Sequence, residues 1–369
     1  MYLTLIYYPL ILVLLFWGAK LCKKGEWNEE VLSFRQTKAF LGFCSIVVLL
    51  HHCAQRTSAG WIKPSVIRPG LNPFLPVGYL CVAMFFFCSG FGMYTSHREK
   101  PDFFKHYLKR RILPLVIPAV FMWLVFRAVE IIKNYKIPDP FILNVFHYVW
   151  YVPVLLVLYI LFYIGFGLIK NEKAGFLIIF IATIIYIATA EYYTPGTWWY
   201  NTHHLFLVGM LTARFSEKIM NVLKKGYILW LILSVIVFVV TFISGSYFYV
   251  VIEMTKNYKW YSIVETVSLY GQLISAFTIV LLMVLIGMKV KIGNKVLMFF
   301  GSFTLELYLV HPLFVQMFGF AFMSDYNKPV YYIENVFLYV LVVLVLSIPI
   351  AFLLSKSISG ILKNKKRRA

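Results

Sequence analysis

The chain has 369 residues, of which 61% are apolar and only 14% are charged, a composition too apolar for an ordinary soluble domain. Lysine and arginine outnumber acidic residues by 35 to 15, and the net charge of +20 alone would suit a nucleic-acid-binding protein. The basic residues, however, stand in short gaps between long apolar runs. We therefore expect the chain to sit in a lipid bilayer and to bind no nucleic acid.

Eleven apolar runs are candidate membrane-spanning helices, because a bilayer core of roughly 30 Å needs about 20 apolar residues per helix. In chain order they are 2–19, 39–53, 75–97, 112–132, 148–169, 175–190, 203–213, 227–244, 263–288, 299–321 and 332–355. Any one short run could be a buried strand. Eleven in succession predict an all-α, polytopic transmembrane helix bundle of 10–11 helices with no soluble domain.

The first run could instead be a signal peptide. Its charges follow the apolar stretch rather than precede it, and no small-residue cleavage site is apparent. We therefore interpret it as an uncleaved anchor. The chain then divides into an extra N-terminal anchor with a cytoplasmic loop (1–33), a membrane domain (34–355) and a basic cytoplasmic tail (356–369).

The positions of the basic residues predict the orientation of the helices. Counted back from the C-terminus, alternate gaps hold 26 of the 35 lysines and arginines, and the opposite gaps hold only 8. Cytoplasmic loops of membrane proteins carry this excess of positive charge. We expect a multi-pass protein of the cell membrane with a cytoplasmic C-terminus and, if all eleven runs span, an external N-terminus.

Two adjacent histidines, His51 and His52, close the second run. A histidine in the outer half of a membrane helix could act as a general base, or its ring could simply bond a backbone carbonyl. Neighbours on a helix point about 100° apart, so the two rings cannot share one face. We expect one of them to be a bystander.

A late run places Glu306, Tyr308 and His311 close together on one predicted helix. Ionisable groups inside a membrane are usually functional, although Glu306 could also pair with a lysine or arginine of a neighbouring helix. The five cysteines lie in or beside apolar runs without metal-type spacing, so we expect no metal and no disulfide framework.

A basic run, Lys109, Arg110 and Arg111, directly precedes another predicted helix. Guanidinium groups bind phosphate in bidentate fashion, so the run would suit a phosphate-bearing ligand. It could equally anchor the topology or contact anionic lipid headgroups.

These segments together resemble acyltransferase family 3, the integral-membrane acyltransferases. The motifs are TKAFLGFCSIVVLLHH (37–52), FFFCSGFGM (85–93), YLKRRILPL (107–115), HYVWYVP (147–153) and GSFTLELYLVHP (301–312), in the order in which the family carries them. Alignment on Gly42 puts the family's histidine at His52. It puts the family's preceding arginine at Leu41, so that arginine is missing, and Lys38 is the nearest cation to replace it.

The resemblance implies an O-acyltransferase that moves an acyl group, usually acetyl, from acetyl-CoA to a hydroxyl of a surface polysaccharide or lipid-linked sugar. It implies His52 as the catalytic base or acyl carrier, and we expect Glu306 to orient its ring or to stabilise its charged form. We expect Lys38 and the basic run 109–111 to receive coenzyme A at the cytoplasmic mouth. Supporting positions are His311, Tyr308, Ser89 and Trp150. The alternative is a polysaccharide exporter of the same family without acyl transfer.

Overall fold

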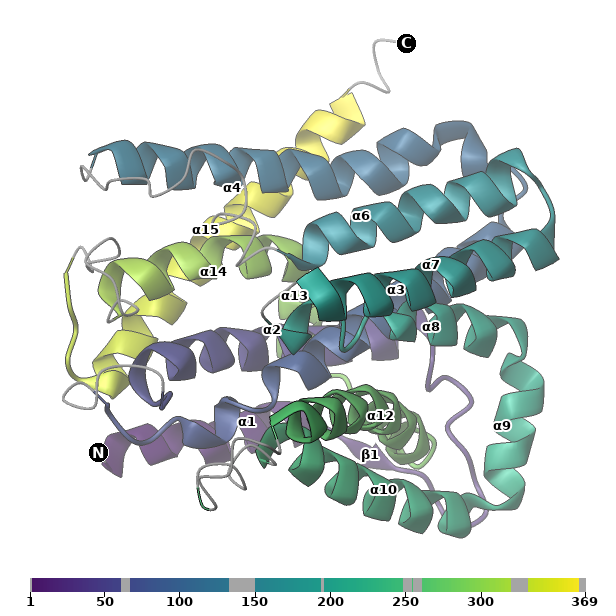
Figure 1. Cartoon of the computed structure of the whole chain (residues 1–369), viewed down its shortest axis with the longest axis horizontal. Coiled ribbons are helices and arrows are strands. Elements are labelled where there is room, and N and C mark those ends of the chain that lie inside the picture. Colours follow the sequence, from purple (N-terminus) through teal and green to yellow (C-terminus); the bar gives the residue numbers. More distant parts are fainter. Residues whose placement is uncertain are drawn as a thin grey trace.

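The structure, a computed structural model, describes residues 2–60, 67–132, 150–193, 196–247, 254, 261–319 and 331–364. In these ranges the chain is almost entirely helical, and most of the long helices run side by side (Figure 1). The predicted all-α membrane bundle is confirmed.

Eight helices are long and apolar enough to cross a membrane within the described residues, some of them counted with a flanking turn. They are α2 (Phe34–Thr57), α3 (Gly78–Glu99), α4 (Leu113–Ile132), α6 (Tyr151–Phe162), α7 (Glu172–Tyr193), α10 (Tyr227–Tyr247), α12 (Tyr261–Gly287) and α15 (Val336–Asn364). The π-helix Leu108–Ile112 leads into α4, and the π-helix Tyr163–Leu168 extends α6.

The remaining elements are shorter. They are α1 (Tyr7–Phe16) with the 3-10 turn Tyr2–Ile6 before it, α8 (His204–Arg214), α9 (Ser216–Lys225), α13 (Lys295–Phe300), α14 (Thr304–Phe318), three further 3-10 turns (Asn72–Phe74, Phe103–His106, Thr197–Trp199) and a pair of two-residue strands, β1 (Lys20–Leu21) and β2 (Val290–Lys291). The predicted continuous helix 299–321 is therefore divided, because the chain turns at Gly301–Phe303 between α13 and α14.

Close helix contacts at glycines bring α3 against α8. A side chain at Gly90 would meet the backbone of Phe206, and one at Gly209 would meet the backbone of Phe87. Small residues let helix backbones approach in this way inside membranes, where packing drives association. The motif around Ser89 and Gly90 thus packs against α8, and in α14 every residue from 307 to 315 is buried.

Loops that the sequence assigned to one side of the membrane gather at one end of the bundle, here called the basic face. Lys20 of β1 pairs with Lys291 of β2, and the Lys224 ammonium lies 2.7 Å from the Glu29 carboxylate. Helix α9 crosses the helix ends at this face rather than running along them (Figure 1).

The first helix runs from the opposite end of the bundle to the basic face. The Tyr8 hydroxyl donates to the Gly70 carbonyl at 2.6 Å, beyond the C-terminal end of α2, whereas the Asn294 amide donates to the Leu14 carbonyl at 2.8 Å, next to β2. Because α1 contacts both ends, it is integrated into the bundle rather than standing apart from it.

Candidate active site

Two histidines from helices far apart in sequence meet inside the bundle. His52 lies near the end of α2 and His311 in the middle of α14, and their Nδ1 and Nε2 atoms are 2.6 Å apart. The ring planes are inclined by only 22°. His311 is fully buried, whereas His52 is only half-buried. His52 is therefore the member of the pair that a substrate can reach.

The acceptors around this pair determine where its protons lie. His311 Nδ1 is 2.7 Å from the carbonyl oxygen of Leu307, which can only accept, so this nitrogen carries the hydrogen. In a neutral imidazole His311 Nε2 then holds the lone pair and accepts from the Nδ1–H of His52. His52 Nε2 consequently carries a lone pair, which is the group that a general base needs.

The neighbouring His51 ring lies 5.3 Å from the His52 ring but has a different hydrogen-bond partner. Its Nδ1 lies 3.0 Å from the carbonyl oxygen of Phe74, and its ring packs where a side chain at Gly78 would otherwise lie. A glycine at the start of α3 thus makes room for His51. The adjacent histidines have different surroundings, as the helical geometry of α2 requires.

Aromatic residues form one wall next to the histidine pair. The Tyr308 ring lies 6.2 Å from the His311 ring and 5.8 Å from that of Tyr151. The Tyr151 and Ser89 hydroxyls are 3.4 Å apart, and Trp150 packs beside Tyr151 with 8% of its surface exposed. The four predicted supporting residues therefore belong to one contiguous region, although they come from two helices, α3 and α14, and from the start of α6.

Glu306 lies one and a half turns before His311, in the first turn of α14. Its carboxyl group is hydrogen-bonded to the Ser355 side chain of α15. The structure thus brings His311, rather than Glu306, into contact with His52. The position beside His52 that was expected to hold the carboxylate is occupied by the His311 imidazole and, behind it, by the Leu307 carbonyl.

The basic residues predicted to bind the donor lie at the basic face, in different settings. Arg111 turns inward, with its guanidinium 5.3 Å from the centre of the Phe103 ring, whereas Arg110 is exposed and Lys109 half-buried. Lys38 belongs to the first turns of α2, and its ammonium lies 5.6 Å from the ring centre of Phe34 on the same helix. Arg111 is thus the member of the basic run that faces the bundle.

Two features escaped the sequence analysis. Arg56 follows His52 by one helical turn and is 3% exposed, so a guanidinium is buried on the same face of α2; the i, i+4 spacing was the available signal. A second feature is a cavity at the basic face beside His97, for which only the basic gap 96–111 gave a hint. Among the described residues, no group of three or more histidines, cysteines or carboxylates could hold a metal ion.

Comparison with known families agrees with these features. A family model described as an acyltransferase domain, acyltransferase family 3, matches residues 42–356. The chain belongs to this family. Comparisons with curated proteins and with solved structures gave no match. The matched region contains the histidine pair, the aromatic wall and the basic run, so this membrane acyltransferase carries its candidate site within the family domain.

Proposed function

We propose that this membrane acyltransferase moves an acyl group, in the simplest case acetyl, from acyl-CoA to a hydroxyl of a cell-surface polysaccharide or lipid-linked sugar. The observation that carries the proposal is the hydrogen-bonded pair of His52 and His311 inside the family's domain. A hydroxyl is a poor nucleophile and a thioester is an activated acyl donor. The protein therefore has to supply chiefly a base and a means of positioning both substrates.

In the proposed mechanism His52 Nε2 accepts the proton of the acceptor hydroxyl as the oxygen forms a bond to the thioester carbonyl carbon. The positive charge that develops on His52 is stabilised through its Nδ1–H by His311, whose own ring is held by the Leu307 carbonyl. Collapse of the tetrahedral intermediate breaks the carbon–sulfur bond. The proton on His52 then passes to the leaving sulfur, which restores the base and releases coenzyme A.

The charge distribution supports entry of the two substrates from different sides. The basic face carries Arg111 and the neighbouring cations, which suit the phosphates of coenzyme A on the cytoplasmic side. The histidine pair lies toward the opposite end, because His52 is close to the end of α2 away from Lys38. The acceptor therefore reaches His52 from the outer side or from the lipid, and the C-terminal tail is cytoplasmic.

The test is acyl transfer by the purified full-length protein in lipid nanodiscs. Acetyl-CoA is supplied together with a hydroxyl acceptor, and release of free thiol and acetylation of the acceptor are both measured. Acceptor acetylation that depends on His52 supports the proposal. A protein that binds and moves a polysaccharide or lipid-linked sugar across the membrane without acylating it would contradict the enzyme and favour the exporter.

A further inference from the structure

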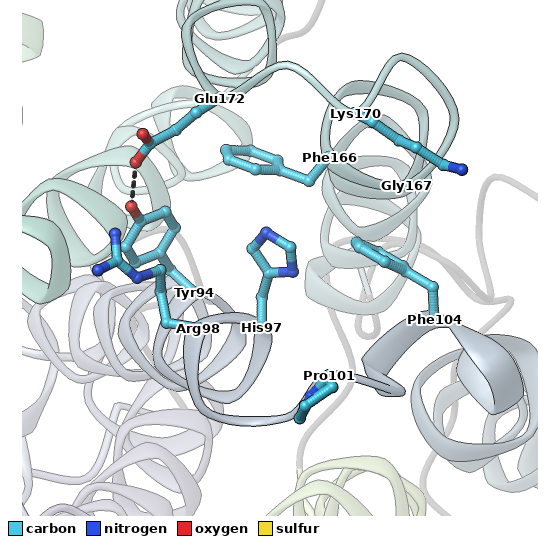
Figure 2. Close-up of a pocket in the computed structure, with 9 residues that line it drawn as sticks. All are labelled: Tyr94, His97, Arg98, Pro101, Phe104, Phe166, Gly167, Lys170 and Glu172. Carbon is cyan, nitrogen blue, oxygen red and sulfur yellow. Dashed lines mark hydrogen bonds between the residues drawn. The ribbon is translucent and has the colours of Figure 1, made fainter.

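A cavity of about 530 Å³ opens at the basic face, between the C-terminal end of α3, the connection to α4 and the start of α7 (Figure 2). This volume is in the range of small-molecule sites. The cavity is separate from the histidine pair. None of the residues assigned to catalysis or to the basic run lines it.

One side of the cavity is aromatic. The His97 ring has Phe104 and Phe166 beside it, at centroid distances of 5.1 and 5.5 Å, and Tyr94 at 6.4 Å (Figure 2). Phe166 and Tyr94 are buried and hold the wall in place, whereas His97 and Phe104 are only half-buried and are the rings that a ligand can reach. A planar aromatic ligand would find ring faces to stack on here, as nucleobases do in other proteins.

Two cations stand at the rim of the cavity. Arg98 lies at the end of α3, and Lys170 lies on the far side of the His97 ring (Figure 2). Lys170 has φ of 56°, a left-handed backbone conformation that is uncommon for a residue other than glycine. This conformation is common directly after a helix, and here it follows the end of the π-helix Tyr163–Leu168.

The single carboxylate of the lining is already occupied. Glu172 accepts a hydrogen bond from the Tyr94 hydroxyl (Figure 2). One of its oxygens also lies 3.4 Å from Arg214 Nε. The charge presented to a ligand is therefore that of Arg98 and Lys170, with the imidazole of His97 between them. An aromatic wall with cations at its rim matches a purine nucleotide that carries phosphate groups.

The geometry points to this cavity as the site for the adenosine bisphosphate end of the acyl-CoA donor, an inference that rests on the proposed function. The distances agree with it. The ring of His51 marks the level of the histidine pair at Gly78, and Tyr94 lies sixteen residues further along α3, about 24 Å away.

The donor's own arm has the length that this separation requires. Roughly sixteen bonds join the 5′ oxygen of adenosine to the thioester sulfur, which is about 20 Å when extended. A nucleotide held at the cavity could therefore present its acyl group near His52. Anionic lipid headgroups share the phosphate chemistry, and the test has to separate them from a nucleotide.

Binding of adenosine 3′,5′-bisphosphate to the full-length protein in nanodiscs tests the site without turnover. Arg98→Gln and Lys170→Gln should each weaken binding about tenfold or more, since each removes a charge-assisted contact to phosphate. Lys173→Gln is the matched control, an exposed lysine three residues on that does not line the cavity. Phe104→Leu should weaken binding of the nucleotide but not of pyrophosphate. Three results would overturn the inference. They are an equal loss of nucleotide and pyrophosphate binding in Phe104→Leu, unchanged nucleotide binding in Arg98→Gln and Lys170→Gln, and no nucleotide binding at all.

Lipid composition and a truncated donor complete the test. Nucleotide binding should persist when the nanodiscs contain only zwitterionic lipid, and displacement of the nucleotide by anionic lipid alone would assign the cavity to a headgroup. In transfer assays the variants should raise the KM for acetyl-CoA but not for S-acetylpantetheine, which lacks the nucleotide. Transfer with an unchanged KM for acetyl-CoA would refute this site and leave the proposed function standing. Nucleotide binding without any acyl transfer would support this site and refute the proposed function.

Discussion

The coupling between His52 and His311 is the sharpest test of the proposed chemistry. Removal of a general base usually slows a reaction by about 10²–10⁴-fold, so His52→Ala should lower kcat at least a hundredfold, which corresponds to about 2.7 kcal/mol of barrier. His311→Ala removes the acceptor 2.6 Å from His52 Nδ1 and leaves the base without its orienting partner. We expect it to lower kcat by about tenfold or more.

The double variant distinguishes a working pair from two independent residues. Residues that act as a unit are strongly non-additive, because once the base is gone its partner has nothing left to orient. His52→Ala/His311→Ala should therefore be about as slow as His52→Ala alone. If the two losses in kcat multiply in the double variant, the histidines act independently, and the proposed pair is refuted even if both single variants are slow.

His51→Ala supplies the matched control. It removes the same side chain from the adjacent position, and with it the hydrogen bond to the Phe74 carbonyl, worth about 0.5–1.5 kcal/mol of stability, and a ring contact to His52 at 5.3 Å, but it leaves the contact between His52 and His311 in place. Turnover should stay near that of the unmodified protein, with a small decrease in the unfolding temperature. Thiol release from acetyl-CoA and thermal unfolding are measured on all four variants in the same nanodiscs. If His51→Ala is inactive and His52→Ala is active, the assignment of the base is wrong by one residue.

Three further outcomes are expected. Arg111→Gln should raise the KM for acetyl-CoA about tenfold or more, and Arg110→Gln should raise it less, because Arg111 faces the bundle and Arg110 is exposed. Equal increases in KM would instead indicate that the basic run is a general anchor. Gly90→Ala should cost about 1–3 kcal/mol of stability, seen as a lower unfolding temperature, because the added methyl group meets the backbone of α8, whereas Gly92→Ala has open space and should not destabilise. A reporter fused after the C-terminal tail should report a cytoplasmic location, and an external signal would overturn the orientation.

The helical bundle could be predicted from the sequence because its two main signals are local. Apolar runs of spanning length follow from the backbone's need for internal hydrogen bonds in lipid, and each of the eleven predicted runs corresponds to a helix in the structure. The break at Gly301 could not be seen in this way. It lies inside an apolar run, and its cause is tertiary, since the backbone of Lys38 on α2 lies where a side chain at Gly301 would be.

The site was accessible to sequence reasoning only in part. His52 came from the family's motif, and His311 was named because an ionisable group inside a membrane is costly. Their contact joins positions 259 residues apart, which no periodicity along the chain reveals. Glu306 was expected to orient the His52 ring, and like His311 it was named as an ionisable group inside a membrane helix. The structure has a backbone carbonyl in this position. Because every residue type carries a carbonyl, its presence there cannot be predicted from the residue types.

The use of a carbonyl in place of a carboxylate has a consequence for the chemistry. A carboxylate beside His311 would favour its charged form and place a second buried charge next to the developing charge on His52. The Leu307 carbonyl fixes the tautomer of His311 through one hydrogen bond without adding a formal charge to the interior of the bundle. The lone pair on His52 Nε2 is thus oriented, and the two histidines stay neutral between turnovers. In the proposed reaction, charge at this depth then arises only while the hydroxyl proton is on His52, and it disappears when that proton leaves with the thiol.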